Sequence, residues 1–437
     1  MTAGQGGLTS VFVVLAASLL VRPLGAVLVG RVSDRVGRRV PFLAMTLLTC
    51  TATALVGLLP TAVRAGAYAA LGLAVLRLAQ AFCTGGETSS SVAYLFESVP
   101  SERRGLVGGF HLASSAAGMA LGLGAVLAVS VALTPAQLLG WGWRLPFLAA
   151  VPLALAVFGA RRRLRESGEF IRAQAVPTPR QSDQDTTERT DEGLTAAVVT
   201  RLVRRRPRTV LSSILVSGAF SVTVTLWFVY VPAYLLATGQ ASPATALGPP
   251  AAGLLATTAC APLAGRLSDR VGRQPLLIGG CIALCLLWPA ALPSVLAGTG
   301  WVAFALASLG VGVALSGFVL ASYLPEAFPT SDRATGVGLT YGIGSGVFGG
   351  VAPLLAGWLL AQHHLPALVI YPVLCAAAAT ISLVWAIRRP DPAGVVGTTR
   401  TGVRGTRSSH GSPISGLPLP RPPGNERDGN VWTTEAE

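Results

Sequence analysis

The stretch Gly30-Arg31-Val32-Ser33-Asp34-Arg35-Val36-Gly37-Arg38-Arg39 returns later as Gly265-Arg266-Leu267-Ser268-Asp269-Arg270-Val271-Gly272-Arg273-Gln274. Each copy follows one long apolar run and precedes another. A charged, glycine-containing hairpin that recurs between hydrophobic segments is typical of membrane proteins built from two related halves. The repeat therefore predicts an all-α polytopic membrane protein, and it supplies a symmetry against which the rest of the chain can be compared.

The composition supports a membrane protein. Of the 437 residues, 51% are hydrophobic and 12% are charged, whereas soluble domains carry about 25% charged residues. The formal net charge is +14, and the arginines gather in loops between apolar runs, as the positive-inside rule requires. We therefore expect a lipid bilayer as the partner and no nucleic acid. The six cysteines lie inside apolar runs without ligand spacing, so the sequence predicts no metal site and no cofactor.

The apolar runs predict about eleven helices, five in the first half and six in the second. Arginine-rich loops alternate with arginine-poor ones, which places the linker and the C-terminal tail in the cytoplasm. The predicted domains are an N-terminal transmembrane bundle (1–160), a cytoplasmic linker (161–208), a C-terminal transmembrane bundle (209–389) and a disordered cytoplasmic tail (390–437). The predicted spans are 8–30, 41–60, 67–95, 105–130, 144–160, 209–237, 246–265, 275–297, 300–324, 335–360 and 366–387.

The repeat exposes an irregularity. Two predicted spans precede the hairpin at Gly265, but only one precedes the hairpin at Gly30. If the halves are true repeats, one span is missing before the first hairpin. Either the start codon is placed too late or the protein has eleven spans.

Several shorter motifs accompany the hairpins. They are Arg22-Pro23-Leu24-Gly25, Arg77-Leu78-Ala79-Gln80 with Gly85-Gly86-Glu87, Trp141-Gly142-Trp143-Arg144-Leu145-Pro146-Phe147, Leu164-Arg165-Glu166-Ser167, and Leu324-Pro325-Glu326-Ala327-Phe328-Pro329-Thr330 before Arg333. With them the chain, from about Leu8 to Arg389, resembles the major facilitator superfamily and its metabolite:proton symporter branch. The resemblance implies a major facilitator fold of two six-helix-type bundles. It also implies import of organic acids, shikimate-like acids, or proline and betaine.

The chain departs from that family in several places. The family's first helix, which carries acidic and aromatic residues near the substrate, has no counterpart. Ala81 stands where the family usually has Gly, Thr88 where it has Trp, and His111 where Gln is common. These departures weaken any transfer of a substrate from the family.

The repeated hairpins are candidate gating elements. Asp34 and Asp269 can pair with a nearby arginine, or face the positive N-terminal end of a helix from the opposite half. The family uses such contacts as a latch that favours one side of the transport cycle; the alternative is a solvated loop. The candidate gating residues are Gly30, Asp34, Arg35, Gly37, Arg38, Gly265, Asp269, Arg270, Gly272 and Arg273.

A second repeated element follows each half's hairpin. Glu97 and Arg104 lie seven residues apart, as do Glu326 and Arg333. Both pairs follow a span and precede a glycine-rich span. We predict that they form cytoplasmic ion pairs that link successive helices within each half and exchange partners during switching.

Four ionisable residues fall inside predicted spans, all in the first half: Arg22, Arg77, Glu87 and His111. Charge in hydrocarbon costs about 2.5 kcal/mol or more, so each must face a cavity or a partner. Glu87 is the candidate proton carrier, because burial lets a carboxyl titrate near neutral pH. Arg77 suits an anionic substrate or a carboxylate on the missing helix, and an Arg22–Glu87 pair is geometrically feasible. The alternative for these arginines and for His111 is a structural hydrogen bond.

Three tyrosines are candidates for the wall of a solute cavity: Tyr230, Tyr234 and Tyr341. Aromatic rings with a polar edge bind organic solutes well. The alternative is anchoring at the membrane interface, which suits Tyr234 near an outer end.

These patterns predict a bacterial inner-membrane transporter that works by alternating access. The expected activity is proton-coupled symport of a small organic acid or zwitterionic metabolite, by a monomer with no enzymatic activity. One alternative is a drug or metabolite exporter, although Ser114–Gly124 lacks the proline of drug antiporters. The other is a transport-inactive, truncated paralogue, which the absent first span alone supports.

Overall fold

The computed structural model describes residues 2–163, 166–168, 170–171, 191–296, 300–362 and 365–388. Every element within these ranges is helical, which confirms the all-α fold. The predicted tail, 390–437, and residues 164, 165, 169 and 172–190 of the predicted linker lie outside the described residues. The first half is defined here as residues 2–161 and the second half as residues 207–388.

The helices of the first half begin with α1 (Thr2–Val36), which leads into the first hairpin. The others are α2 (Arg39–Leu58), α3 (Ala62–Ala65), α4 (Ala67–Glu97), α5 (Arg104–Ala132), α6 (Pro135–Gly140) and α7 (Leu145–Arg161), with the short turns η1 (Ser101–Arg103) and η2 (Gly142–Arg144).

The second half follows the linker helix α9 (Asp191–Arg205). Its helices are α10 (Pro207–Thr225), the π-helical segment η3 (Leu226–Tyr230), α11 (Val231–Ala237), α12 (Pro243–Val271), α13 (Arg273–Leu296), α14 (Trp301–Ser316), α15 (Leu320–Glu326), the turn η4 (Thr330–Asp332), α16 (Arg333–Ile343), the π-helical segment η5 (Gly344–Gly349), α17 (Gly350–Ala361) and α18 (Leu365–Arg388).

Ten stretches within the described helices are long and apolar enough to cross a membrane. The eleventh predicted span, 246–265, lies in α12, which is 29 residues long and contains three internal prolines. Prolines, glycines and threonines make α12 less apolar than the other ten. It is nevertheless central, because it packs against α5 and α14.

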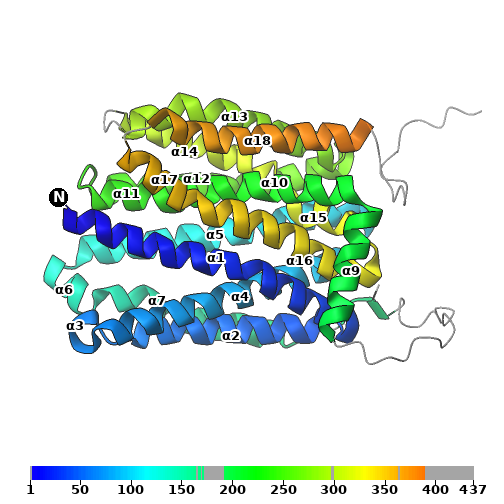
Figure 1. Ribbon diagram of the computed structural model, residues 1–437, viewed down its shortest axis with the longest axis horizontal. Helices are drawn as coiled ribbons and strands as arrows, with labels where there is room; N and C mark the ends of the chain where they lie inside the picture. Colours follow the sequence, from blue (N-terminus) through cyan, green and yellow to red (C-terminus); the bar gives the residue numbers. More distant parts are fainter. Residues whose placement is uncertain are drawn as a thin grey trace, which may run out of the picture. The chain divides into compact units, whose positions relative to one another are not determined.

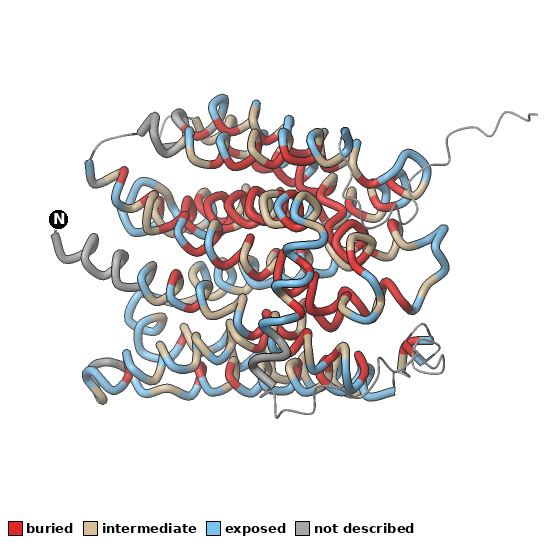
Figure 2. Tube along the Cα trace, turned by 45° about the vertical axis from the view of Figure 1, so that its right-hand side comes forward, coloured by how far each residue is buried: buried red, intermediate tan, exposed pale blue. Residues whose placement is uncertain are grey.

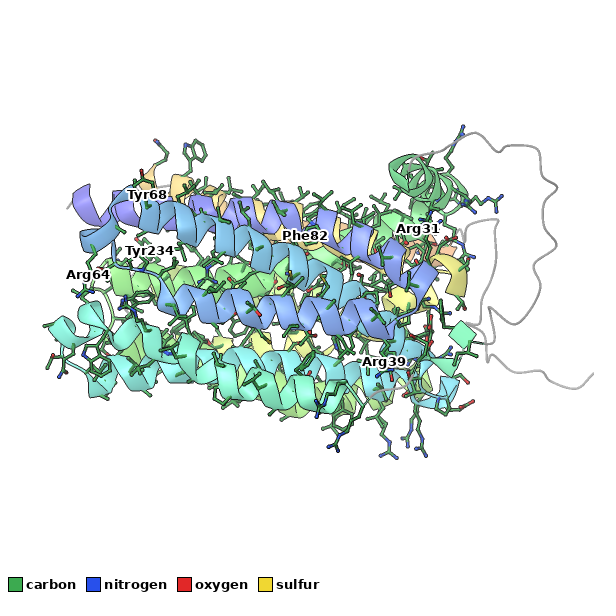
Figure 3. The ribbon with its side chains drawn as sticks, turned by 90° about the horizontal axis from the view of Figure 1, so that it is seen from below. Arg31, Arg39, Arg64, Tyr68, Phe82 and Tyr234 are labelled. Carbon is green, nitrogen blue, oxygen red and sulfur yellow. The ribbon has the colours of Figure 1, made fainter. Side chains whose placement is uncertain are left out.

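The two hairpins end their helices in the same way. Gly37 has a φ of 115° and Gly272 a φ of 95°, a region that residues with a Cβ rarely adopt. Both glycines therefore permit the chain to reverse between long helices. The basic residues Arg31 and Arg39 lie at this end, whereas Arg64 and Tyr68 lie at the opposite end (Figure 3).

The halves meet along two pairs of helices. α1 of the first half packs against α16 of the second, and α5 packs against α12. In Figure 1 these elements lie in the middle, between α13 and α18 on one side and α2 on the other. α9 crosses the helix ends at the arginine-rich end (Figure 1), with Val198 and Leu202 buried.

Burial differs sharply between the halves. In the second half, 67% of the most apolar window of Pro207–Ala237 and 56% of that of Trp301–Glu326 is buried. In the first half, the buried share of this window is 11% both for Ala67–Glu97 and for Ser101–Ala132. The helices at the bottom of Figure 2, which belong to the first half, are accordingly mostly exposed or intermediate.

Candidate functional site

A cavity of about 290 Å³ opens between α1, α2 and α4 of the first half. Its walls carry two guanidinium groups, one amide and several hydroxyls on an otherwise apolar surface. Its volume is at the lower end of the range for small-molecule sites, ~300–1,000 Å³. The lining residues are Leu15, Ser18, Leu19, Arg22, Thr49, Arg77, Gln80, Ala81 and Thr84.

Arg22 supplies one of the two cations of this cavity. Its Nε is buried and has no hydrogen-bond partner among the described residues. Its guanidinium lies 5.4 Å from the ring centroid of Tyr341, on α16 of the opposite half. A cation–π contact uses the positive charge of the guanidinium and does not occupy its N–H donors. Arg22 can therefore still donate to an anion in the cavity.

Arg77 supplies the second cation, from α4. Its Nη1 donates to Oε1 of Gln80 over 3.4 Å, and its guanidinium lies 6.0 Å from the ring centroid of Phe147. Gln80 is itself held, because its Nε2 donates to Oγ1 of Thr53 over 2.8 Å. The amide thereby positions Arg77 without neutralising its charge.

Glu87 lies just beyond the cavity along α4. It follows the lining residue Thr84 by three residues, a rise of about 4.5 Å, and Arg77, Gln80 and Glu87 share one side of the helix. Its Oε1 accepts a hydrogen bond from Oγ1 of Thr46 over 3.2 Å. The Arg22–Glu87 pair is not formed, since Arg22 has no ion pair with any described residue.

The other candidates within the membrane lie elsewhere. His111 is half-buried on α5. Tyr230 is 2% exposed in the core of the second half, and its ring stacks on that of Tyr234 with centroids 6.2 Å apart. Tyr234 lies towards the same end as Arg64 (Figure 3). Tyr341 contacts Arg22, which lines the cavity.

At the arginine-rich end, Asp34 binds the start of a helix of the other half. Its carboxylate accepts hydrogen bonds from the backbone N–H of Ala334 over 3.1 Å and that of Thr335 over 2.8 Å. Oγ1 of Thr335 donates a third, over 2.6 Å, and Arg38 forms an ion pair with the same carboxylate. A carboxylate at the N-terminus of α16 is favoured by the unpaired N–H groups and the helix dipole.

Asp269 repeats this contact in the opposite direction. It accepts from the backbone N–H of Gly105 over 2.7 Å and that of Leu106 over 2.9 Å, at the start of α5. Arg273 pairs with it at 2.7 Å. The contact between each hairpin carboxylate and a helix of the opposite half is thus present twice, while the gating role of the hairpins stays a prediction.

Two hairpin glycines let the halves approach closely. A Cβ on Gly30 would lie 2.8 Å from the carbonyl oxygen of Ala334, and one on Gly265 would lie 2.3 Å from that of Gly105. The remaining hairpin candidates, Arg35 and Arg270, are exposed.

Arg38 is fully buried at this end, and so are the side chains of its partners Asp34 and Glu97, each 0% exposed. It donates to Glu97 over 2.9 Å and to the carbonyl oxygen of Thr330, from the other half, over 2.9 Å. Burial alone would lower the pKa of Arg38, but the hydrogen bond to Glu97 and the charges of Asp34 and Glu97 hold that pKa above its usual value. Arg38 therefore stays charged.

The ion pairs differ from the predicted pairing within each half. Glu97 accepts from Arg38 and, across the halves, from Arg333 at 2.9 Å. Glu326 pairs with Arg273 at 3.1 Å and lies near enough to Arg104 to interact with its charge. The seven-residue spacing indicates only which residues are close along one segment of the chain. In the structure, Arg333 and Arg104 instead lie next to the glutamates of the opposite half.

The sequence analysis gave no role to several residues that complete these sites. Glu166 accepts from the backbone N–H of Arg38 over 2.8 Å and that of Arg39 over 3.1 Å, so it caps α2. Ser167 donates to Glu97 over 2.7 Å. In the cavity, Gln80 was missed as the partner of Arg77. The spacing of Arg77 and Gln80 could have predicted this contact, because residues three apart on a helix are neighbours.

The chain matches the family model described as Major Facilitator Superfamily over residues 2–345 and 251–420. It is 32% identical over 379 residues to the ectoine/proline transporter ProP of Corynebacterium glutamicum, covering 85% of this chain and 74% of that protein. It is 30% identical over 349 residues to the alpha-ketoglutarate permease of Escherichia coli, covering 78% and 76%.

A solved structure shares the fold. The proton:xylose symporter XylE superposes with a TM-score of 0.67 at 17% sequence identity, covering 87% of this chain and 86% of that one. At this identity the likeness concerns the arrangement of helices alone.

Proposed function

Because the chain belongs to the major facilitator superfamily, we propose that it is a proton-coupled symporter of a small organic acid or zwitterionic metabolite. The observation that carries this proposal is the cavity that Arg22 and Arg77 share inside the first half. Two cations on apolar spans cost free energy, about 2.5 kcal/mol each by insertion scales. Charged residues inside apolar spans therefore usually have a function. The N–H donors of these two arginines suit the binding of a carboxylate.

The neighbouring groups define the solute further. Gln80 and Thr84 offer polar contacts beside the arginines, while Leu15 and Leu19 form an apolar wall. A carboxylate with a compact, partly apolar body fits this surface. The curated relatives named above carry proline, ectoine and alpha-ketoglutarate, all compact solutes with a carboxyl group.

Glu87 is the proposed proton carrier. It lies one turn beyond the cavity and towards the latch, and it accepts a hydrogen bond from Oγ1 of Thr46. A carboxyl group at this place can exchange a proton with water when the cavity is open. The charge of the bound solute then lies close enough to Glu87 to couple its protonation to occupancy.

Alternating access would use the contacts at the arginine-rich end, which the positive-inside rule places in the cytoplasm. Asp34 and Asp269 each hold a helix of the opposite half, and Arg333 holds Glu97. With these contacts made, the cytoplasmic side is closed. Opening towards the cytoplasm requires that they separate together.

The test uses proteoliposomes with an imposed proton gradient and radiolabelled proline, betaine and alpha-ketoglutarate. We expect uphill accumulation of at least one of these solutes. The Glu87→Gln variant is expected to lose accumulation but to retain solute exchange, since exchange needs no net proton movement. Glu102→Gln, the same change at an exposed loop position, is the control and should accumulate normally. Unchanged uphill uptake by Glu87→Gln would rule out this residue as the carrier.

A second set of variants tests the cations. Arg22→Gln and Arg77→Gln should each raise the solute concentration needed for half-maximal uptake by tenfold or more. This corresponds to about 1.4 kcal/mol or more of binding free energy. Arg64→Gln, at an exposed position near the opposite end, should leave it unchanged.

A transport-inactive paralogue is the second candidate, and the low burial of the first half favours it. It predicts correct membrane insertion and an intact latch, but neither uptake nor exchange for any solute.

A further inference from the structure

Phe96 is a buried aromatic residue at the arginine-rich end of the molecule. It lies on α4 directly before Glu97, and 3% of it is exposed. The guanidinium carbon of Arg104 lies 4.0 Å from the centroid of its ring, and that of Arg333 lies 5.0 Å from the same centroid. Cation–π contacts act within about 6 Å. One buried ring therefore attracts two cations.

Repeated motifs show which positions of the two halves are equivalent. The hairpins relate α1 to α12, and the arginines that begin α5 and α16 relate these two helices. Glu97 and Glu326 end α4 and α15, so α4 corresponds to α14 and α15 together. Counted from these glutamates, the counterpart of Phe96 is Pro325, whose side chain has no π system. At this pair of positions, the first half alone supplies an aromatic ring.

The two cations stand at the helix starts that the hairpin carboxylates bind. Arg104 is the first residue of α5, and Arg333 is the first residue of α16. In each helix, the backbone N–H of the following residue donates to the hairpin carboxylate of the opposite half. Phe96 therefore contacts the side chain beside each of these two hydrogen bonds, and it belongs to the contact region between the halves.

The two contacts of the ring respond differently when the halves separate. Phe96 and Arg104 belong to the same half and are joined through η1, so they move together. Arg333 belongs to the other half, and its Nη1 also donates to Glu97 over 2.9 Å. Separation of the halves at this end removes Arg333 from the ring as well as from the carboxylate. The attraction between Arg333 and Phe96 therefore contributes only to the closed arrangement.

We propose that Phe96 is a positioning residue for alternating access: the face of its ring attracts Arg333 and thereby favours the arrangement in which the arginine-rich end is closed. This inference rests on the alternating access proposed above, but not on the solute or on Glu87. The other role open to a buried ring is to fill space. Cation–π attraction depends on the electron density of the ring, whereas packing depends on its shape.

Fluorination of the ring separates these two roles. Trifluorophenylalanine at position 96 keeps nearly the shape of the native ring, but fluorine withdraws electrons and makes the ring face less negative. The same replacement of Phe328 is the matched control. Phe328 is also 3% exposed and packs against Gly336, and among the described residues no guanidinium lies over its ring. Phe96→Leu removes the π system and keeps an apolar side chain.

The measurement uses a thiol buried between the halves. Ser322 on α15 is 0% exposed, and a Cβ on Gly108 of α5 would lie 2.9 Å from its Oγ. Ser322→Cys therefore reports separation at this end, and Ser101→Cys, in the exposed turn η1, is the reference. Each is introduced alone into a chain whose six native cysteines are replaced by alanine. The rate of labelling by a membrane-impermeant maleimide is measured in inside-out vesicles, which expose the arginine-rich end.

We expect trifluorophenylalanine at position 96 to raise the labelling rate of Ser322→Cys, relative to Ser101→Cys, by about threefold or more. Phe96→Leu should raise this ratio as well, and trifluorophenylalanine at position 328 should leave it unchanged. The fluorinated chain decides the test if Phe96→Leu fails to fold.

An unchanged ratio with trifluorophenylalanine at position 96 would overturn the proposal, even if Phe96→Leu raises it, because the ring would then only fill space. An equal rise with the replacement at Phe328 would overturn it too, and so would a Ser322→Cys thiol that no variant exposes to labelling. The assay contains no solute and no proton gradient, so its failure is separable from failure of the proposed symport.

Discussion

The arginine-rich ends of the two halves are alike, whereas their middles are not. At the ends, Asp34 and Asp269 each bind two backbone N–H groups of the opposite half. In the middles, Phe304 is fully buried while its counterpart Val75 is 55% exposed. Contacts between the halves therefore do not require a filled core within each half. The proposed latch joins helix ends and hairpins, whereas the cavity proposed for the solute is lined by helix faces.

The largest expected difference concerns the two hairpin arginines. Arg38 is 0% exposed and binds Asp34 and Glu97, whereas Arg273 binds Glu326, whose side chain is 27% exposed. Arg38→Ala leaves two buried carboxylates without their cation and should lower stability by about 3–5 kcal/mol. Arg273→Ala should cost roughly half as much, since water reaches Glu326. Thermal unfolding in detergent, with Arg103→Ala as an exposed control, measures both. Equal losses would show that the two latches are equivalent.

The second comparison concerns the filled and the open middle. Phe304→Ala removes a fully buried ring that packs against Trp227 and should cost on the order of 3 kcal/mol. Val75→Ala, at the equivalent position, should change stability by less than about 0.5 kcal/mol. Tryptophan fluorescence during unfolding reports both. A large effect of Val75→Ala would contradict the exposure of Val75 in the structure.

The third comparison uses a charged and a neutral residue at equivalent positions. Thr257, the counterpart of Arg22, donates to the carbonyl oxygens of Gly253 over 3.1 Å and Gly312 over 2.9 Å. Thr257→Val should cost about 1 kcal/mol, the net value of a buried hydrogen bond. Arg22→Leu should instead raise stability, by about 2 kcal/mol, because it removes a charge from an apolar span, and it should abolish uptake. Destabilisation by Arg22→Leu would indicate a structural role for the arginine.

The smallest expected effect concerns the ion pair of Arg31 and Asp332, whose equivalent positions cannot form an ion pair. Arg31 and Asp332 lie 3.7 Å apart, with 18% and 13% of their side chains exposed, whereas the counterpart positions Arg266 and Arg103 are both basic. A double-mutant cycle of Arg31→Ala and Asp332→Ala should give a coupling free energy of about 0.5 kcal/mol that falls with salt. A coupling above about 2 kcal/mol would make this pair part of the latch.

The contacts of the hairpin carboxylates were predicted better than the cavity. Asp34 and Asp269 lie in a motif repeated almost letter for letter, for which the sequence allowed an arginine pair, a helix N-terminus of the opposite half, or a solvated loop. Both carboxylates make the first two contacts. The partner of Arg333 could not be read from spacing, because Glu97 lies 236 residues away. A contact between halves depends on how the bundles meet, and no local pattern encodes that.

The cavity was predicted only in part. Arg22 and Arg77 were identified because charge inside a span needs a reason, and both line the cavity. Tyr230 was assigned to a cavity wall on its residue type, but it is 2% exposed in the second-half core. A tyrosine side chain is suited both to packing in a core and to binding a solute. The residue type alone therefore does not predict its role, which depends on its position in the fold.

The reciprocal contacts of the hairpins have a kinetic consequence. Asp34 of the first half binds the start of α16, and Asp269 of the second half binds the start of α5, so both contacts join the same two halves. If these contacts form the proposed latch, we expect them to break together, so that the arginine-rich end opens in a single event with one relaxation time.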